Sequence, residues 1–261
     1  MAIPVTAIYT HDECLLHDPG EGHPESPQRL KDVLSALEKK FPRLNGDVAW
    51  KNPSLGTDTQ VLYCHDPLYL QKLKALNQSL TANSAPVHTD VDTRISQHSL
   101  RAALAGVGAI CQAVDDVYSG TVKNAFCAVR PPGHHALTDQ SMGFCLFGNV
   151  AIAAHHALTK PGIKRVAIVD FDVHHGNGTQ NLVENNDSIL FFSIHQSPLW
   201  PYQGAAEERG TKDNIRNFPT APQSNTKVFY DIFEQKIIPE LSAFKPDFVI
   251  LSAGFDAHRD D

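Results

Sequence analysis

The sequence of 261 residues has no long hydrophobic run, no paired cysteines and no surplus of basic residues. No apolar stretch reaches the ~20 residues that a membrane helix needs, so we expect no membrane partner. The five cysteines include no C-x-x-C pair, which favours reduced thiols over a disulfide framework. The formal net charge of −7 argues against direct nucleic-acid binding. The first residues do not show the basic segment followed by an apolar segment that is typical of a secretory signal, which favours a cytoplasmic location.

Histidine, in contrast, is abundant, and several of the 14 histidines stand in adjacent pairs near acids. Short apolar runs alternate with helical patterns, and no repeat or linker divides the chain, so we expect a single domain over residues 1–261. The expected strands are Val5–Tyr9, Ala125–Val129, Arg165–Val173, Ser188–Ile194 and Asp247–Ser252. The expected helices are Pro27–Lys39, Pro67–Leu76, Leu100–Val117, Gly148–Leu158 and Lys227–Ala243.

This alternation predicts an α/β fold, a mostly parallel sheet with helices on both faces. In such folds the active site lies beyond the carboxyl ends of the strands. Polar motifs follow several of the expected strands, so the strand ends are where we expect the chemistry.

The most informative segment runs from Ile168 to Gly178, where an apolar strand leads into acids, two histidines and a Gly-Asn-Gly turn. On a strand, alternate residues share a face, so Asp170, Asp172 and His174 are expected to point the same way. Carboxylate oxygen and imidazole nitrogen are common ligands of catalytic zinc, and Asp172 and His174 are candidates. The simpler interpretation is a strand end whose acids cap the next helix.

A second expected strand ends in Arg130-Pro-Pro-Gly and then His134-His135. Proline and glycine fix the backbone of such a loop without a helix. Two adjacent imidazoles on a rigid loop suit a paired acid and base, because each disfavours protonation of the other.

Two further strands end in polar residues. Ser252-Ala-Gly-Phe-Asp256 offers Asp256 as a third metal ligand, a weak signal when taken alone. Ser193 is a candidate for a structural cation site that also uses backbone carbonyls. The pair His155 and His156 has no acid or glycine nearby, so we interpret it as exposed or as satisfied within the core.

These segments together resemble the histone deacetylase superfamily, nearest to its class II and bacterial amidohydrolase-like branch. The likeness rests on Arg130-Pro-Pro-Gly-His-His-Ala, on Asp170-Phe-Asp-Val-His-His-Gly-Asn-Gly, on Ser252-Ala-Gly-Phe-Asp-Ala-His and on His23-Pro-Glu-Ser-Pro-Gln-Arg29. The resemblance implies an arginase-like three-layer α/β sandwich. It also implies a deacetylase that removes acetyl groups from acetyl-lysine proteins or from acetylated polyamines.

The resemblance implies roles for single residues as well. Asp172, His174 and Asp256 would bind Zn²⁺, although Fe²⁺ also suits this ligand set. His135 would be the general base, and His134 would stabilise or protonate the leaving amine. The other implied roles are as follows: Asp170 orients His134, Asn177 orients His135, Asp170 and Ser193 contribute to a K⁺ site, and Gly143, Phe144 and Trp200 line a substrate tunnel.

The sequence departs from the family pattern at its end, because it stops at Asp261 without the usual C-terminal strand and tyrosine motif. That tyrosine would stabilise the tetrahedral oxyanion, and the strand would lie inside the sheet. We therefore expect a fragment of a longer enzyme, or else a natural truncation that binds zinc or acyl-lysine with weak or no activity.

Other hypotheses have less support. An arginase-type ureohydrolase would use two Mn²⁺ ions and more carboxylates, and the Pro-Pro-Gly-His-His segment argues against it. A serine hydrolase is disfavoured because no G-x-S-x-G elbow occurs. The sequence leaves open whether the chain forms a homo-oligomer.

Overall fold

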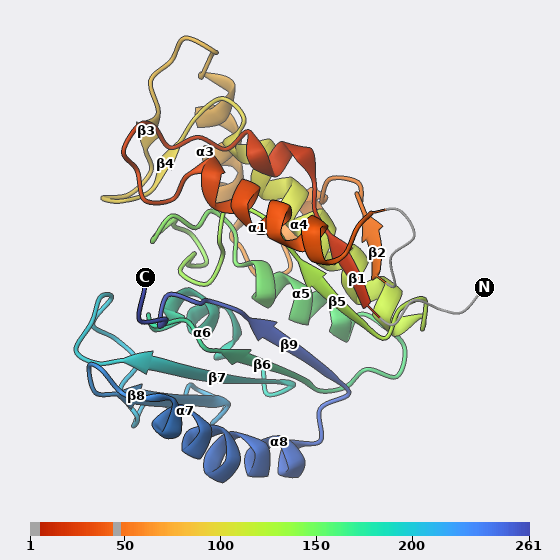
Figure 1. Ribbon diagram of the computed structural model, residues 1–261, viewed down its shortest axis with the longest axis vertical. Coiled ribbons are helices and arrows are strands. Elements are labelled where there is room, and N and C mark those ends of the chain that lie inside the picture. The colour runs from red at the N-terminus through yellow and green to blue at the C-terminus, as the bar shows by residue number, and fades with distance from the viewer. Residues whose placement is uncertain (1–5, 44–47) are drawn as a thin grey trace.

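The computed structural model of the protein describes residues 6–43 and 48–261, and its larger sheets are entirely parallel (Figure 1). One sheet has the order β2-β1-β5 and the other the order β8-β7-β6-β9. The strands are β1 (Thr6–Tyr9), β2 (Val48–Lys51), β5 (Asn124–Cys127), β6 (Val166–Asp170), β7 (Ile189–Gln196), β8 (Ile215–Thr220) and β9 (Phe248–Ser252). A short antiparallel pair, β3 (Val87–His88) and β4 (Arg94–Ile95), stands apart from both sheets.

Helices connect the strands. They are η1 (Asp12–Leu15), α1 (Pro27–Lys40), α2 (Asp58–Val61), α3 (Pro67–Gln78), α4 (Ser99–Tyr118), α5 (Asn149–Leu158), α6 (Asn177–Val183), α7 (Thr226–Ile232), η2 (Phe233–Ile237) and α8 (Ile238–Phe244). The last three follow one another directly, since η2 is a π-helical turn between α7 and α8. Local chemistry marks several starts: Asp66 accepts hydrogen bonds from the first turn of α3, and Pro67 follows it at the first helical position.

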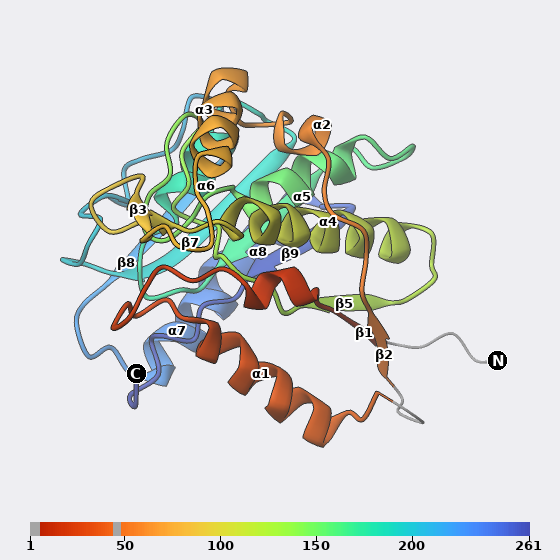
Figure 2. The ribbon, with the colours of Figure 1, turned by 90° about the horizontal axis from the view of Figure 1, so that it is seen from above.

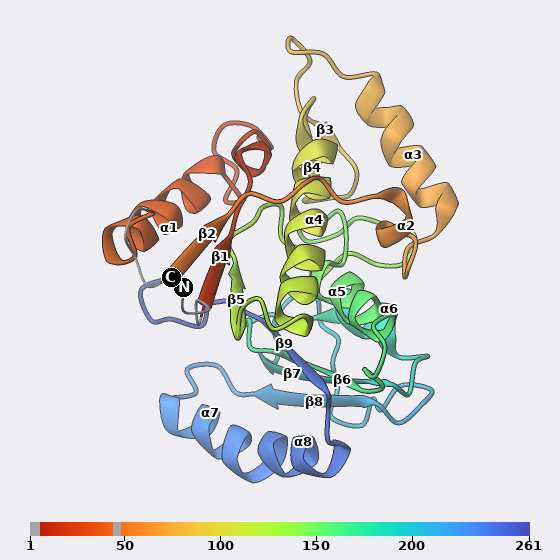
Figure 3. The same ribbon diagram turned by 90° about the vertical axis from the view of Figure 1, so that its right-hand side faces the viewer.

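Helices cover both faces of the four-stranded sheet (Figures 1 and 3). On β6, Ile168 packs into the large core cluster that contains α5, while Val169 packs against the α7–α8 layer. On β7, Phe191 likewise packs into the large core cluster and Phe192 packs against the α7–α8 layer. This alternation buries every residue of β6, as expected of a strand covered on both faces. The predicted α/β fold class is therefore confirmed.

The second sheet shares part of the same helical layer. Helix α4 packs on β1 and β5, and it also packs on α5, so the long helix links the two sheets (Figure 2). Tyr9 on β1 is fully buried in this region, and its hydroxyl donates a 2.6 Å hydrogen bond to Asp116 on α4.

The sequence-based boundaries were right for most elements, with instructive exceptions. Val5, the expected first residue of a strand, lies outside the described residues. The strand expected over Arg165–Val173 ends at Asp170, because the Asp172 amide donates to Asp170 Oδ1 and turns the backbone out of the ladder. Asp172 and His174 are thus loop residues, and the prediction that they share a strand face with Asp170 was wrong.

Several short elements were missed, among them two strands of the parallel sheets and helix α6. β8 was not expected because Pro219 interrupts its pattern, yet proline is compatible with an edge strand, and among the described strands β8 pairs only with β7. β2 is a four-residue strand without a fully buried side chain. Helix α6 begins inside the Gly-Asn-Gly turn, which the sequence presented as a turn alone.

The strands β5 and β9 each pair on one side only within the described ranges. Their outer side chains are open: Phe126 is 37% exposed, Val249 48% and Leu251 58%. Whether a further strand belongs beside them, as the family resemblance implies, stays a prediction.

Candidate metal and histidine site

The parallel register brings the predicted residues to one edge of the four-stranded sheet. Asp170 at the end of β6 stands level with Ser193 on β7 and with Ser252 on β9. The loops that follow β6 and β9 then supply Asp172, His174 and Asp256. The carboxyl-end location expected from the fold class is therefore where these residues meet.

Asp172, His174 and Asp256 form a group that fits a metal ion. One ligand atom from each lies within 4.8 Å of the others. His174 Nδ1 is 3.0 Å from Asp172 Oδ1 and 2.9 Å from Asp256 Oδ2. The backbone holds the acids in place, because Val173 N donates to Asp256 Oδ1 and His174 N to Asp172 Oδ1. Two carboxylate oxygens and one imidazole nitrogen are a donor set suited to a divalent ion.

The close approach of the β9 loop depends on Gly254. A Cβ atom at this position would lie 2.1 Å from Asp172 Oδ2, so a larger residue would push Asp256 away from the group. Hydrogen bonds to Asp172 and then to Asp256 raise the pKa of His174 to about 10, against the opposite effect of burial. A metal ion must therefore displace a proton from His174 when it binds.

His134 lies beside this group and is tied to a carboxylate. Its Nδ1 donates a 3.0 Å hydrogen bond to Asp170 Oδ2, and its Nε2 is 3.7 Å from Asp172 Oδ2. Asp170 is fully buried. Burial alone would lower the pKa of His134, but the charges of Asp170 and Asp172 outweigh burial and raise the pKa to about 9. At neutral pH this imidazole is protonated.

His135 packs against His134, but its partner is an amide. The two rings are 3.8 Å apart, and His135 Nδ1 is 2.7 Å from Asn177 Oδ1. An amide oxygen only accepts, so Nδ1 carries the hydrogen and Nε2 keeps its lone pair. Burial and then the positive charge of His134 lower the pKa of His135 well below its usual value. This imidazole is neutral and able to act as a base.

Two glycines let the surrounding backbone come this close. A Cβ at Gly178, in the first turn of α6, would lie 2.3 Å from the backbone carbon of His135. A Cβ at Gly176 would lie 2.6 Å from Asp170 Oδ2. The Gly-Asn-Gly turn is therefore required for Asn177 to reach His135.

Of the predicted tunnel residues, Trp200 and Gly143 lie beside His135. The Trp200 ring lies 4.6 Å from the His135 ring and 6.1 Å from the His174 ring. Gly143 fits between His135 and Trp200, since a Cβ there would be 2.4 Å from His135 Cδ2 and 2.7 Å from Trp200 Cη2. Phe144 follows in a left-handed conformation with φ of 67°.

Two residues that the sequence did not single out hold this turn. Gly143 N donates to Asp92 Oδ1 at 3.1 Å, and Phe144 N donates to Thr93 Oγ1 at 3.0 Å. Asp92 and Thr93 lie between β3 and β4, and no periodicity marks them. Their partners are close only in the folded chain, so the sequence alone carries no signal for this contact.

Ser193 lies next to Asp170 but already has a partner. Its Oγ is 3.0 Å from His195 Nδ1, and both residues are almost fully buried. A K⁺ site at Asp170 and Ser193 stays a prediction. His155 and His156 lie away from the site, as expected: His156 bonds to Asp115 Oδ1, and His155 lies 3.4 Å from the Leu182 carbonyl oxygen.

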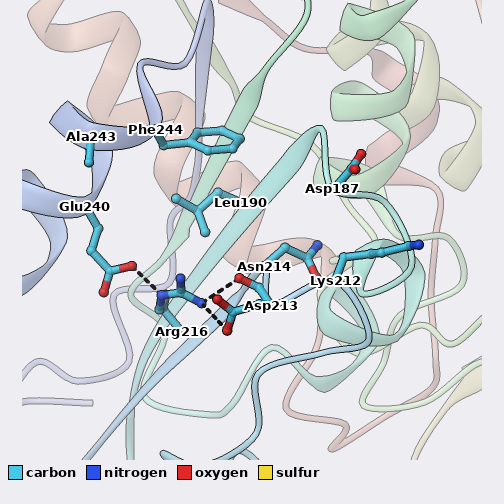
Figure 4. A pocket seen from close by; sticks show the side chains of 9 residues that line it. All are labelled: Asp187, Leu190, Lys212, Asp213, Asn214, Arg216, Glu240, Ala243 and Phe244. Carbon is cyan, nitrogen blue, oxygen red and sulfur yellow. Dashed lines mark hydrogen bonds and ion pairs between the residues drawn. The ribbon is translucent and has the colours of Figure 1, made fainter.

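A surface cavity of about 330 Å³ lies at the opposite edge of the sheet (Figure 4). It is lined near the amino ends of β7 and β8 and by α8, where Arg216 pairs with Glu240 and Asp213. It shares no residue with the histidine and metal group. Within the described residues, no helix is long and apolar enough to span a membrane.

Fold and site define an α/β protein with a candidate metal group and a histidine pair at the carboxyl edge of its sheet. Comparison with known proteins agrees. Residues 23–261 match the histone deacetylase domain family. The crystal structure of the HDA15 HD domain superimposes with a TM-score of 0.91 and 36% identity, covering all of this chain and 74% of that one.

Curated relatives extend the comparison. An uncharacterized protein of Synechocystis, slr0245, is 44% identical, with 98% of this chain and 83% of that protein covered. The histone deacetylase-like amidohydrolase of Pseudomonas aeruginosa is 32% identical, with 98% and 71% covered. The type-2 histone deacetylase 2 of Dictyostelium discoideum is 36% identical, and this chain spans only 17% of its length. The chain belongs to the histone deacetylase family, and its fold is the arginase/deacetylase-like α/β fold.

Proposed function

We propose that this chain hydrolyses an acyl amide and releases acetate from acetyl-lysine side chains or acetylated polyamines. The observation that carries the proposal is the position of three convergent ligand atoms beside two histidines with opposite pKa shifts. Family membership supports a deacetylase or amidohydrolase, and metal dependence is general in this family.

Asp172, His174 and Asp256 would hold the metal, with Zn²⁺ as our first choice and Fe²⁺ as the alternative. When bound, the ion would polarise the acyl carbonyl and acidify a water molecule. Side chains of the protein itself carry out the proton transfers and bind the substrate.

His135 accepts a proton from the attacking water at Nε2, the nitrogen that Asn177 leaves free. His134 begins protonated and donates its proton to the leaving amine. Asp170 keeps His134 in that state through the hydrogen bond to Nδ1. Two environments thus give two adjacent imidazoles different roles.

Gly143, Phe144 and Trp200 provide the walls for the substrate in this proposal. A linear alkyl chain suits an aromatic passage, and the acyl amide would reach His135 at its end. Both acetyl-lysine and acetylpolyamines have such a chain. Asp170 and Ser193 would add the K⁺ site, which acts on structure rather than on the substrate.

The first test is acetate release by the intact chain from a panel of acetyl-lysine peptides and acetylated polyamines, with zinc measured per chain. Release well above that of Asp172→Ala is the expected result, and the ranking of substrates identifies the natural class. Bound zinc without release from any substrate would overturn the hydrolase and favour the alternative, a weakly active or inactive module that binds zinc or acyl-lysine.

A further inference from the structure

Arg130 and Glu25 form a buried ion pair that the mechanism above does not use. Their side chains are 5% and 1% exposed. Arg130 Nε donates to Glu25 Oε1 and Nη2 to Glu25 Oε2, so the pairing is bidentate. The remaining contacts of the guanidinium are to backbone, with Nη1 donating to the Cys14 carbonyl and Nη2 to the His17 carbonyl, each at 3.0 Å.

The same pair fixes the segment 14–25 to the body of the protein. His17 Nε2 is 3.2 Å from Glu25 Oε2, and His17 Nδ1 is 2.7 Å from Ser99 Oγ at the start of α4. Burial opposes ionisation of Glu25, but hydrogen bonds from His17 and Arg130 lower its pKa to about 2. The segment is therefore held by a charged, fully engaged group in addition to the apolar packing of Cys14 and Leu15.

This segment reaches the candidate substrate wall through His23. The Glu25 amide donates to His23 Nδ1 at 3.1 Å, and His23 Nε2 donates to the Asp92 carbonyl at 3.1 Å. The His23 ring then packs edge-on against Phe144, with ring centres 4.9 Å apart. A continuous set of contacts thus joins Arg130, four residues before His134, to the wall at Phe144.

We propose that Arg130 and Glu25 are positioning residues whose buried ion pair holds His23 against Phe144 and so fixes the wall next to the histidine pair. Neither residue belongs to the metal group or to the histidine pair. A buried ion pair often stabilises a protein no more than apolar packing would. The ion pair lies between the histidine loop and the wall at Phe144, which argues that it fixes the position of that wall.

The test compares Glu25→Gln and Arg130→Lys with Asp116→Asn, a matched control. Asp116 pairs with Lys51 and with the buried Tyr9, but it contacts neither the histidine loop nor Phe144. A further variant, His23→Ala, removes the ring on Phe144 and leaves the ion pair intact. Each full-length variant is assayed for acetate release from an acetyl-lysine peptide, and hydrogen exchange is measured at the Gly143 and Phe144 amides.

We expect Glu25→Gln, Arg130→Lys and His23→Ala to raise KM about tenfold and to change kcat less than about threefold. The reason is that a displaced wall weakens substrate binding equally in the ground state and in the transition state. Exchange at Gly143 and Phe144 should quicken in all three. Asp116→Asn should lower the Tm but leave KM and this exchange unchanged.

The proposal is overturned if Asp116→Asn changes KM and exchange as much as Glu25→Gln does, or if none of the three variants changes either. This inference rests on the proposed hydrolase. If the unaltered chain releases no acetate, that function fails, and hydrogen exchange still decides the positioning role. If one ion-pair variant does not fold, the other gives the decision, because His23→Ala leaves the ion pair intact and tests only the contact with Phe144.

Discussion

His134 and His135 are neighbours in the chain and in space, yet their surroundings give them opposite acid strengths. His134 faces the carboxylate of Asp170, and its pKa rises to about 9. His135 faces the amide of Asn177, and its pKa falls well below 6.5. Both are buried, so burial alone does not explain the difference.

The partner on Nδ1 therefore decides the role of each imidazole. A negative partner compensates for the cost of burying an imidazolium, whereas an amide orients the ring without that compensation. Asp170 comes from the end of β6 and Asn177 from the start of α6, seven residues later. One short segment of chain therefore sets both protonation states.

The largest expected effect comes from removing each imidazole. His135→Ala should lower kcat by about 10³ to 10⁴-fold, because the variant loses the base that takes the water proton. His134→Ala should cost less, about 10²-fold, since water can protonate a leaving amine. Steady-state acetate release measures both, with zinc content per chain as the control for an intact metal group. A greater loss in His134→Ala would reverse the assigned roles.

Substituting the two partners, by Asn177→Asp and by Asp170→Asn, should narrow the pH range of activity from the acidic and from the alkaline side respectively. Wild-type activity is lost as pH falls through the low pKa of His135, and Asn177→Asp raises that pKa, so the acidic limb moves upward. Activity is also lost as pH rises through the pKa of His134 near 9. Asp170→Asn lowers that pKa, so the alkaline limb moves downward.

The measurement is kcat/KM from pH 5 to 10 for each variant. When the pKa that governs a limb moves by one pH unit, the rate on that limb should fall about tenfold at a fixed pH. The comparison fails if Asn177→Asp moves only the alkaline limb, or if neither variant moves either limb.

The third histidine of the site extends the comparison to metal binding. His174 shares Asp172 with His134, and its pKa is raised to about 10. Since a proton must leave His174 before Zn²⁺ binds at Nδ1, apparent affinity should rise about tenfold per pH unit between pH 6 and 8. Competition with a chelating dye at several pH values measures this, and His134→Ala is the control with the same ligand set. An affinity that does not change with pH would contradict the protonation state given to His174.

The sequence was sufficient to predict much of this site and not the rest, for physical reasons. Asp172, His174 and Asp256 could be expected together because parallel strands end at one edge. The partners Asp170 and Asn177 came from the family resemblance, and the structure adds their atoms and distances.

Other features depend on contacts across long stretches of chain. Arg130 and Glu25 are 105 residues apart, and Asp92 and Gly143 are 51 apart. The end of β6 was placed too late because the Asp170 side chain accepts a hydrogen bond from the Asp172 amide, a contact that the hydrophobic pattern does not report. Edge strand β8 was missed for a different reason: its proline and polar residues interrupt the apolar pattern by which a strand is predicted.

The smallest effect is expected at His156, which tests whether any buried histidine with an aspartate partner would behave like His134. Its Nε2 lies 2.9 Å from Asp115 Oδ1, close to the His134 distance. Its pKa is nevertheless lowered, first by burial, because Asp115 is half exposed and also pairs with Lys160. His156→Ala should change kcat/KM by less than about twofold and lower the free energy of unfolding by about 2 kcal/mol. Acetate release and urea unfolding measure the two. If His156→Ala reduced the rate as much as His134→Ala does, the charges of Asp170 and Asp172 around His134 would no longer explain the role assigned to His134.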